Sequence, residues 1–298
     1  MHIPVLQKEV LELLNPKPNE NFIDCTLNEG GHSILILEKT GPKGKILGID
    51  WDQEALEKVR KGKPEFKKRL ILENDNFSNL TEIVKKNRFN SVSGILFDLG
   101  MSSWQLEESG RGFTFLKKEP LDMRFNPNNP LTASKILNYW SEAEIERIVR
   151  EYGEEKFSSQ IAKEIIKTRR VGSIENTVQL VEIIKKAVPF KLQHQNIHFA
   201  TRTFQALRIA ANDELMNLEK ALPQALDVLK EEGKILVISF HSLEDRIVKN
   251  FFKNKSFAGE LKIIAKKPIE PGLKEIKENP RSRSAKLRAG IKMSKKNE

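Results

Sequence analysis

Acidic side chains follow several strand-like segments in the first hundred residues of this 298-residue chain. Asp24, Asp50 and Asp98 each lie at or near the end of such a segment, and Glu29 lies in the turn after the first one. In an open α/β sheet the carboxyl ends of the strands meet at one edge, which is where ligands bind. Carboxylates gathered there favour a ligand with a positive charge and disfavour a polyphosphate.

The turn after the first strand has the sequence T-L-N-E-G-G-H-S, residues 26–33. Paired glycines at a strand-to-helix turn allow a ligand to approach the backbone closely. The G-x-G-x-x-G phosphate fingerprint is absent, and Glu29 would lie where a pyrophosphate binds. Asp50 follows Gly31 by 19 residues, close to the spacing of roughly 20 at which a carboxylate holds ribose hydroxyls. These features favour a cationic, adenosine-containing ligand, and S-adenosylmethionine is the candidate.

Each of these residues also has a structural interpretation. A strand-end aspartate is often the N-cap of the next helix. Phe77 is placed to cover an adenine ring, but a phenylalanine after a strand is more often a core residue. Cys25, the only cysteine, lies within the first strand and is expected to be buried and structural. One cysteine forms neither an internal disulfide nor a thiolate zinc site.

The elements that position these residues follow an α/β pattern. Strands are expected at residues 21–26, 45–50, 69–73 and 93–99, and helices at 31–39, 52–61 and 79–86. After residue 100 amphipathic stretches indicate a helical insertion, with helices at 141–151, 158–169 and 177–187. The α/β pattern then resumes with a helical run at 204–230, a strand at 234–240, a helix at 243–252 and paired strands at 261–267 and 285–292. The fold class is therefore α/β, a doubly wound Rossmann-like sheet with an inserted all-helical domain.

This pattern predicts two domains. Residues 1–103 and 204–298 form one discontinuous ligand-binding domain, and residues 104–203 form the helical insertion, which is expected to recognise the substrate.

The charge of the chain indicates a polyanionic partner. The formal net charge is +10, and residues 266–298 contain 11 basic and 4 acidic side chains. Such a tail suits nucleic acid, because neutralising phosphates releases counterions, although a solvated basic tail has the same composition. No apolar run approaches the ~18 residues of a membrane span. Lys8, Glu9 and Glu12 interrupt any signal-like stretch at the start of the chain, so we expect a cytoplasmic protein without a membrane partner.

Several longer segments resemble one known family. They are TLNEGGHS, DLGMSSWQLE, RGFTF, LDMRFN, RTFQALRIAANDEL, SFHSLEDR and NPRSRSAKLR, in this order. The chain resembles the MraW family, also called RsmH, from His2 to about Lys292. These enzymes use S-adenosylmethionine to methylate the exocyclic N4 of a cytidine in small-subunit ribosomal RNA. The resemblance implies a class I methyltransferase sheet with a helical insertion, and it implies donor contacts at Gly30, Gly31, His32, Asp50, Phe77, Asp98 and Gln105.

The chain departs from the family pattern at four positions. Asn28 and Glu29 stand where relatives usually carry glycine, Asn126 stands where aspartate is usual, and Phe199 stands where proline is common. The Gly30-Gly31-His32 core is intact, so activity is expected to survive these substitutions.

The resemblance also implies a mechanism. Methyl transfer to an exocyclic amine needs alignment and no covalent enzyme intermediate. Asp98 is the expected catalytic residue: it either accepts a hydrogen bond from N4 or orients the amino group of the donor. His32 is expected to contact the donor, with a general-base role as the alternative. No metal-ligand spacing is present, so no catalytic metal is expected.

The RNA is expected to be held by cationic and aromatic side chains. The expected substrate-binding residues are Arg124, Arg202, His241, Arg281 and Arg283. Further candidates are Arg111, Arg208, Trp104 and Phe113. Arg208, which lies within a predicted helix, has the alternative of a salt bridge, and His241 has the alternative of a helix cap. Naked rRNA and the assembled small subunit are both open as the substrate, as is the oligomeric state. The alternative functions are methylation of DNA or protein, and a non-catalytic role in ribosome assembly.

Overall fold

The computed structural model describes residues 4–193 and 197–294. The chain forms two compact units, one of residues 1–100 with 215–298 and the other of residues 101–214. His2, where the family resemblance begins, and Lys295 and Lys296, which contribute to the basic tail, lie outside the described residues.

The first unit is built on a seven-stranded sheet with the order β3-β2-β1-β4-β5-β7-β6. The strands are β1 (Asn21–Asp24), β2 (Ile46–Asp50), β3 (Leu70–Asn74), β4 (Val92–Asp98), β5 (Leu229–Ser239), β6 (Leu261–Ile263) and β7 (Lys286–Lys292). Strands β1 to β5 pair in parallel, while β7 pairs antiparallel with both β5 and β6. The strand order reverses between β1 and β4, which is where doubly wound sheets bind ligands. The predicted α/β class and the final strand pair are confirmed.

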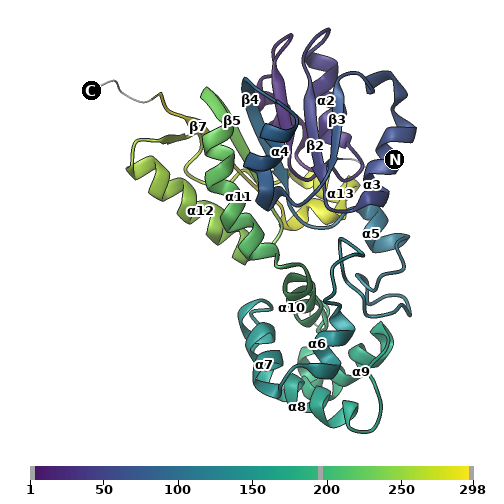
Figure 1. Ribbon diagram of the computed structural model, residues 1–298. Coiled ribbons are helices and arrows are strands. Elements are labelled where there is room, and N and C mark those ends of the chain that lie inside the picture. The colour runs from purple at the N-terminus through teal and green to yellow at the C-terminus, as the bar shows by residue number, and fades with distance from the viewer. Residues whose placement is uncertain (1–3, 194–196, 295–298) are drawn as a thin grey trace. The chain divides into compact units, whose positions relative to one another are not determined.

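Alternating apolar residues cover both faces of this sheet. Ile95 and Phe97 of β4 pack in one core with helices α4, α11 and α12, while Leu96 between them packs in a second core with α1, α2 and α3. This alternation is what the period of two in a strand requires. Figure 1 shows α4, α11 and α12 gathered on one side of the sheet.

The helices of the first unit connect these strands or follow them. They are α1 (Gln7–Leu14), α2 (Gly31–Lys39), α3 (Gln53–Gly62), α4 (Leu80–Lys86), α11 (Glu214–Val228), α12 (Ser242–Phe257) and α13 (Leu273–Glu278), with short 3-10 turns at Pro64–Phe66, Phe77–Asn79 and Pro280–Ser284. Asp52 caps α3, accepting a hydrogen bond from the backbone N–H of Glu54 (3.1 Å). The carboxylate of Asp52 therefore stabilises the start of α3.

The second unit is helical. Its helices are α5 (Ser103–Glu107), α6 (Ala133–Tyr139), α7 (Glu142–Glu151), α8 (Ser158–Arg169), α9 (Thr177–Ala187) and α10 (Thr201–Asn212), with a 3-10 turn at Phe190–Leu192. One hydrophobic core holds them together, and its buried members run from Phe113 to Ala211. Capping boxes begin α5, α7 and α9. The expected helical insertion is present (Figure 1).

The second boundary of the insertion differs from the expected one. The sequence placed it before residue 204, whereas the compact helical unit extends to Glu214. Helix α10 belongs to this unit because Phe204, Leu207 and Ala211 are buried in the helical core. The predicted helical run at 204–230 is interrupted at Asp213, whose φ of 51° ends α10 before α11 begins. A residue in this left-handed region cannot continue a right-handed helix.

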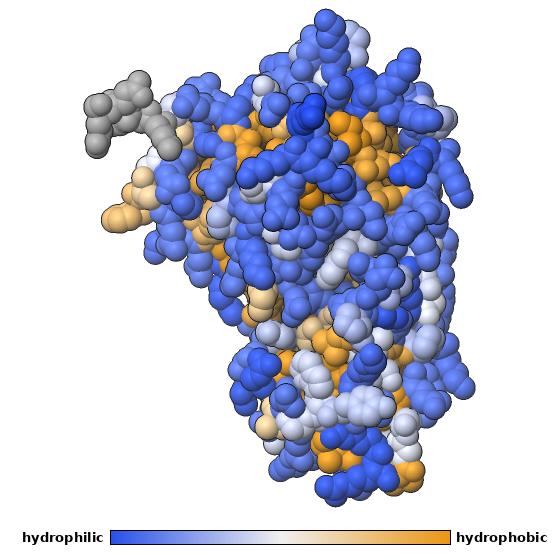
Figure 2. Space-filling view, in the orientation of Figure 1, coloured by the Kyte–Doolittle hydropathy of each residue, from blue (hydrophilic) through white to orange (hydrophobic). Residues whose placement is uncertain are grey.

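No helix among the described residues has the length and hydrophobicity to span a bilayer. In the view of Figure 2, hydrophilic side chains cover much of the visible surface of each unit, with hydrophobic side chains showing between them.

Candidate functional site

Three aspartates lie at the carboxyl ends of neighbouring strands. Asp24 ends β1, Asp50 ends β2 and Asp98 ends β4, and β1 lies between the other two strands. The predicted acidic edge is therefore present, at the point where the strand order reverses. Asp24 and Asp50 are 2% and 9% exposed, so the environment of each carboxyl decides what it can do.

Asp50 holds the turn that follows β1. Its Oδ2 accepts the backbone N–H of Asn28 (2.7 Å), and its Oδ1 accepts the backbone N–H of Asp52 (2.8 Å). Burial outweighs these two hydrogen bonds and raises the pKa of Asp50 to about 7. A carboxylate oxygen has two lone pairs, so each oxygen of Asp50 still has room for a ligand hydroxyl.

The turn itself requires left-handed backbone at two positions. Asn28 has a φ of 50° and Gly30 a φ of 73°. Asparagine tolerates this region better than most residues, so Asn28 can adopt this backbone conformation without being glycine. At Gly31 a Cβ would lie 2.5 Å from Cγ of Pro4. Gly31 is therefore needed for packing against Pro4 as well as for any approach of a ligand.

Asp24 is bound within the fold. Its carboxylate accepts the hydroxyl of Ser33 (2.7 Å) and the backbone N–H of Thr26 (3.2 Å). Burial outweighs these hydrogen bonds and raises the pKa of Asp24 to about 6. Asp24 thus contributes charge to the edge while it fastens the start of α2 to the end of β1.

Asp98 has the least satisfied carboxyl of the three. Its backbone N–H donates to the hydroxyl of Thr26 (2.6 Å), but its Oδ1 is buried and accepts no hydrogen bond from residues 4–193 or 197–294. Nε2 of His32 lies 3.7 Å from Oδ2. Burial raises the pKa of Asp98 well above its usual range, and the charges of Asp24 and Glu244 raise it further. A buried acceptor without a donor is costly, so this atom indicates a place for a ligand donor.

Phe77 lies after β3, at the first position of a 3-10 turn. Its ring packs edge-on against Phe97, with ring centroids 5.7 Å apart, and the side chain is half-buried against the core. Phe77 therefore has the structural role that the sequence left open, while part of its surface remains available to a ligand.

His241 caps helix α12. Its Nδ1 accepts the backbone N–H of Glu244 (3.4 Å), and the carboxylate of Glu244 accepts the backbone N–H groups of Phe240 (2.8 Å) and His241 (3.3 Å). Nε2 of His241 lies 3.1 Å from Oε1 of Glu244. Of the two interpretations of His241, the structure bears out the helix cap, one residue earlier than the sequence placed the helix.

Gln105 has a structural role in the helical unit. It completes the capping box of α5: its side chain accepts the backbone N–H of Ser102 (3.0 Å), and the hydroxyl of Ser102 accepts the backbone N–H of Gln105 (3.1 Å). Gln105 is 4% exposed.

Two of the arginines named from the sequence are bound within the helical unit. Arg124 makes two 2.7 Å hydrogen bonds to the carboxylate of Asp122 and two of 2.6 Å to the carbonyls of Pro127 and Asn129. Arg208 pairs with both carboxylate oxygens of Glu214 at 2.8 Å, which confirms the salt-bridge alternative. Arg124 thus holds the loop that contains Asn126, and its guanidinium is already engaged.

Three of the remaining basic candidates are exposed, and the fourth, Arg111, is half-buried. Arg202 lies in the first turn of α10, and Arg281 and Arg283 lie in the 3-10 turn that precedes β7. Arg111 instead lies over the ring of Trp104 (5.2 Å), and Phe113 is 6% exposed and stacks on Phe125. Of these residues, Arg202, Arg281 and Arg283 have exposed side chains.

Two hydroxyl groups that hydrogen-bond to the strand-end aspartates were not predicted from the sequence. Thr26 and Ser33 link Asp98 and Asp24 to the turn after β1. Their position, two residues after a strand-end aspartate and at the start of the next helix, is the signal that would have indicated this role. The cap formed by His241 and Glu244 has the spacing of a capping box, with the glutamate at the third helical position.

Comparison with known proteins gives consistent matches along the whole chain. A model of the MraW methylase family matches residues 1–293. The ribosomal RNA small subunit methyltransferase H of Heliobacterium mobile is 46% identical over 308 residues, covering 98% of this chain and 99% of that protein. The protein of the same name from Sulfurihydrogenibium azorense is 47% identical over 292 residues, covering 98% and 99%. A solved rRNA methylase from Streptococcus thermophilus aligns over 99% of both chains at 10% identity and a TM-score of 0.46.

Proposed function

The chain belongs to the MraW methylase family, and from this premise we propose that it transfers a methyl group from S-adenosylmethionine to small-subunit ribosomal RNA. The observation that carries the proposal is the full-length match to relatives that bear the name of this activity. The finer proposal is that the acceptor is the exocyclic N4 of one cytidine.

The acidic edge fits the proposed methyl donor. Oδ1 of Asp98 is buried without a donor among the described residues, and S-adenosylmethionine offers ammonium, amine and hydroxyl donors. We assign its binding to Gly30, Gly31 and His32 at the start of α2, and to Asp50, Phe77 and Asp98 at the strand ends. When bound, it supplies a methyl group on a positively charged sulfur. Gln105 is assigned an indirect role in donor binding, because its side chain completes the capping box of α5.

Asp98 is the proposed catalytic residue. A carboxylate that accepts a hydrogen bond from an N4–H group leaves more electron density on the nitrogen as the methyl group arrives. The raised pKa of Asp98 suits a group that takes up the proton which the methylated nitrogen releases. The 3.7 Å approach of His32 allows the ring to orient the carboxyl.

The proposed substrate contacts are the basic candidate side chains that are exposed to solvent. Arg202, Arg281 and Arg283 are assigned to RNA phosphates. Arg124 is assigned an indirect role because its guanidinium holds its own loop. His241 is assigned to substrate binding, and the helix cap that its Nδ1 forms with the backbone N–H of Glu244 fixes the orientation of its ring. We also propose that the protein works in the cytoplasm, that small-subunit rRNA or the assembled subunit is its partner, and that no catalytic metal is needed.

The test is methylation of isolated small ribosomal subunits and of naked small-subunit rRNA with labelled S-adenosylmethionine. Mass spectrometry of nuclease fragments then locates the label. The proposal predicts one labelled cytidine carrying an N4-methyl group. Label on protein, on DNA or on another atom of the base would contradict the acceptor, and absence of label in both substrates would contradict the activity.

A further inference from the structure

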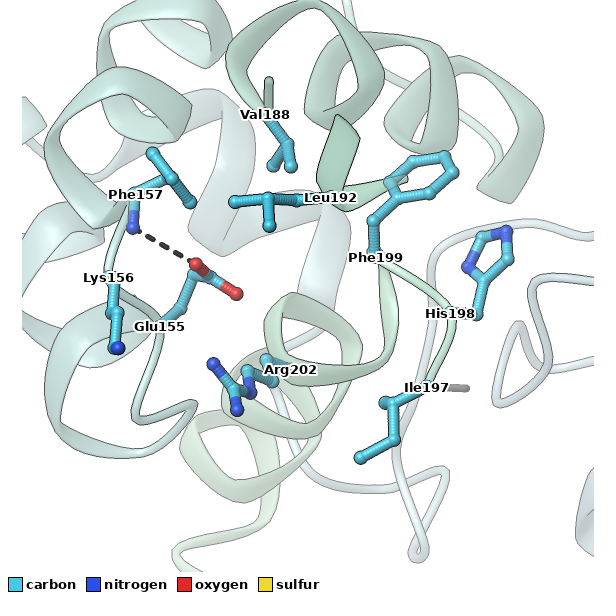
Figure 3. A pocket seen from close by; sticks show the side chains of 9 residues that line it. All are labelled: Glu155, Lys156, Phe157, Val188, Leu192, Ile197, His198, Phe199 and Arg202. Atoms are coloured by element: carbon cyan, nitrogen blue, oxygen red, sulfur yellow. Dashed lines mark hydrogen bonds between the residues drawn. The ribbon is translucent and has the colours of Figure 1, made fainter. Parts of the chain in front are cut away.

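The helical unit contains a pocket of about 580 Å³, and Arg202 is the one lining residue to which a role is assigned above. It lies among the α7–α8 connection, the end of α9, the 3-10 turn at Phe190–Leu192 and the first turn of α10 (Figure 3). Its lining residues are Glu155, Lys156, Phe157, Val188, Leu192, Ile197, His198, Phe199 and Arg202. A pocket that takes a small molecule typically has a volume of about 300–1,000 Å³.

One wall of the pocket carries a stack of aromatic rings. The ring of His198 stacks between Phe115 (centroids 4.4 Å apart, 13°) and Phe199 (4.3 Å, 28°), so both of its faces are covered and Phe199 is the lining residue of this stack left to pair with a base. Nδ1 of His198 accepts the backbone N–H of Ala200 (3.2 Å), which fixes the orientation of the ring. Burial lowers the pKa of His198, so the ring is neutral at neutral pH. Unstacked RNA bases are held on rings of this kind.

A carboxylate is directed into the same space. Glu155 is 7% exposed, and its Oε1 accepts the backbone N–H of Phe157 (3.0 Å). Figure 3 shows the second carboxylate oxygen of Glu155 pointing away from this hydrogen bond and into the pocket. A largely buried acceptor placed in this way selects a ligand with a hydrogen-bond donor.

Two cations lie at the pocket. The side chains of Lys156 and Arg202 are exposed, and neither forms an ion pair with a residue in the described part of the chain. Figure 3 shows Arg202 on the same side of the pocket as Glu155. A guanidinium beside a base pocket suits a phosphate, which it binds in a bidentate manner.

We propose that this pocket binds one unstacked nucleotide of the RNA substrate, and that the base of this nucleotide carries an exocyclic amino group. The proposal rests on the rRNA methylation proposed above. In it the base stacks on Phe199, whose ring His198 supports from its other side, its amino group donates to Glu155, and its phosphate contacts Arg202. Uracil presents a carbonyl where cytosine presents an amino group, so it is disfavoured against Glu155.

The direct test uses cytidine and uridine 5′-monophosphates with the full chain labelled at methyl groups. The methyl resonances of Val188 and Leu192, which line the pocket, report binding, and those of Ile95 in the sheet serve as the internal reference. Cytidine monophosphate is expected to shift the pocket resonances at a lower concentration than uridine monophosphate. Equal affinity for the two nucleotides, or shifts elsewhere only, would overturn the proposal.

Two variants sharpen this test. Glu155→Gln keeps an oxygen for the backbone N–H of Phe157 and replaces the second oxygen with an NH₂ donor, so it is expected to reverse the preference towards uridine. Arg202→Gln is expected to weaken both nucleotides about tenfold, the effect of removing one strong charged interaction. Arg170→Gln, at an exposed arginine that ends α8, is the matched control and is expected to change neither affinity. An unchanged preference in Glu155→Gln would contradict the assigned role of its carboxylate.

Methylation kinetics separate this proposal from the function on which it rests. Glu155→Gln is expected to raise the KM for the RNA substrate and to leave kcat close to that of the unmodified protein. Normal methylation with no nucleotide at the pocket, or with an unchanged KM in Glu155→Gln, would overturn the subsite alone. Nucleotide binding in a protein that methylates no rRNA would instead overturn the proposed function.

Discussion

Asp98 differs from Asp24 and Asp50 in what its carboxyl contacts. The other two carboxylates accept hydrogen bonds from the turn after β1 or from neighbouring residues, whereas Oδ1 of Asp98 has no donor in the described part of the chain. Burying this oxygen without a hydrogen-bond donor lowers the free energy of unfolding. Such a cost is typical of a group retained for function.

Replacement of Asp98 tests this interpretation. Asp98→Asn is expected to lower methyl transfer about 100-fold or more, the usual effect of removing a group that acts on the reacting atoms. The variant should melt at or above the temperature of the unmodified protein, because it removes a buried carboxyl whose ionisation is opposed by burial. Asp227→Asn, at an exposed position, is the control. Turnover within a few-fold of normal in Asp98→Asn would contradict the assignment.

The buried carboxyls also predict how stability depends on pH. Burial raises the pKa of Asp50 to about 7 and that of Asp24 to about 6, whereas an unfolded aspartate titrates near pH 3.9. Between these values the folded chain holds protons that the unfolded chain has released, so the free energy of unfolding falls as the pH rises.

The prediction is that the Tm of the ligand-free protein decreases from about pH 4 to about pH 7, the interval between the unfolded and folded pKa values of these groups. Asp50→Asn should flatten this decrease, and Asp227→Asn should not. The slope is the measured quantity, since Asp50→Asn also alters the hydrogen bond to Asn28. A Tm that rises over this interval would show that the two carboxyls are ionised in the folded state.

The site residues that lie at strand ends could be predicted from the sequence, because the ends of the strands could be predicted. Asp50 and Asp98 follow apolar strands, and their convergence at one edge needs only the parallel topology. The contacts of Thr26, Ser33 and Asn28 depend on how the turn after β1 closes, which no local pattern specifies. Arg124 was named as a substrate contact because the sequence does not show that its loop engages it.

At the scale of elements, the cap of α12 shows how one side chain can fix a helix beside the site. His241 and Glu244 form a reciprocal capping box at the end of β5. Loss of an N-cap typically costs about 0.5–2 kcal/mol.

His241→Ala is expected to lower the free energy of unfolding by about 1 kcal/mol, while His241→Asn, which keeps a capping acceptor, should restore most of it. Denaturant unfolding of both variants gives the comparison. If alanine and asparagine had the same stability as histidine, the cap would not contribute to the fold.

Helix and strand boundaries were predictable where periodicity and caps agree. The bounds of α2, α8 and α9 coincide with the expected ranges. The sequence did not indicate the break between α10 and α11, because Asp213 ends α10 through its backbone conformation and the good helix formers Ala211 and Glu214 lie close to it on either side. Strand β5 begins at Leu229, within the run that the sequence assigned to a helix.

At the scale of the whole molecule, the basic tail is part of the sheet. Strand β7 lies between β5 and β6, so truncation of the tail would remove an interior strand along with the exposed cations. Point substitutions in the turn before β7 avoid this difficulty.

The double variant Arg281→Gln/Arg283→Gln is expected to weaken RNA binding and to reduce the slope of log affinity against log salt by about 2, roughly one for each phosphate that is no longer neutralised. Binding is measured by filter retention or anisotropy over a range of salt concentrations. A double Gln variant at the exposed Lys249 and Lys253 of α12 should leave the slope close to normal. An unchanged slope in the arginine variant would remove these residues from the RNA interface.

The central claim is that the acidic edge of the sheet accepts a sulfonium compound and rejects a polyphosphate. Calorimetric titration of the full chain with S-adenosylmethionine and with NADP, under identical conditions, tests it most directly. The account predicts saturable heat with S-adenosylmethionine, strongly reduced in Asp50→Asn, and no binding of NADP. Tight binding of NADP together with no uptake of S-adenosylmethionine would contradict it.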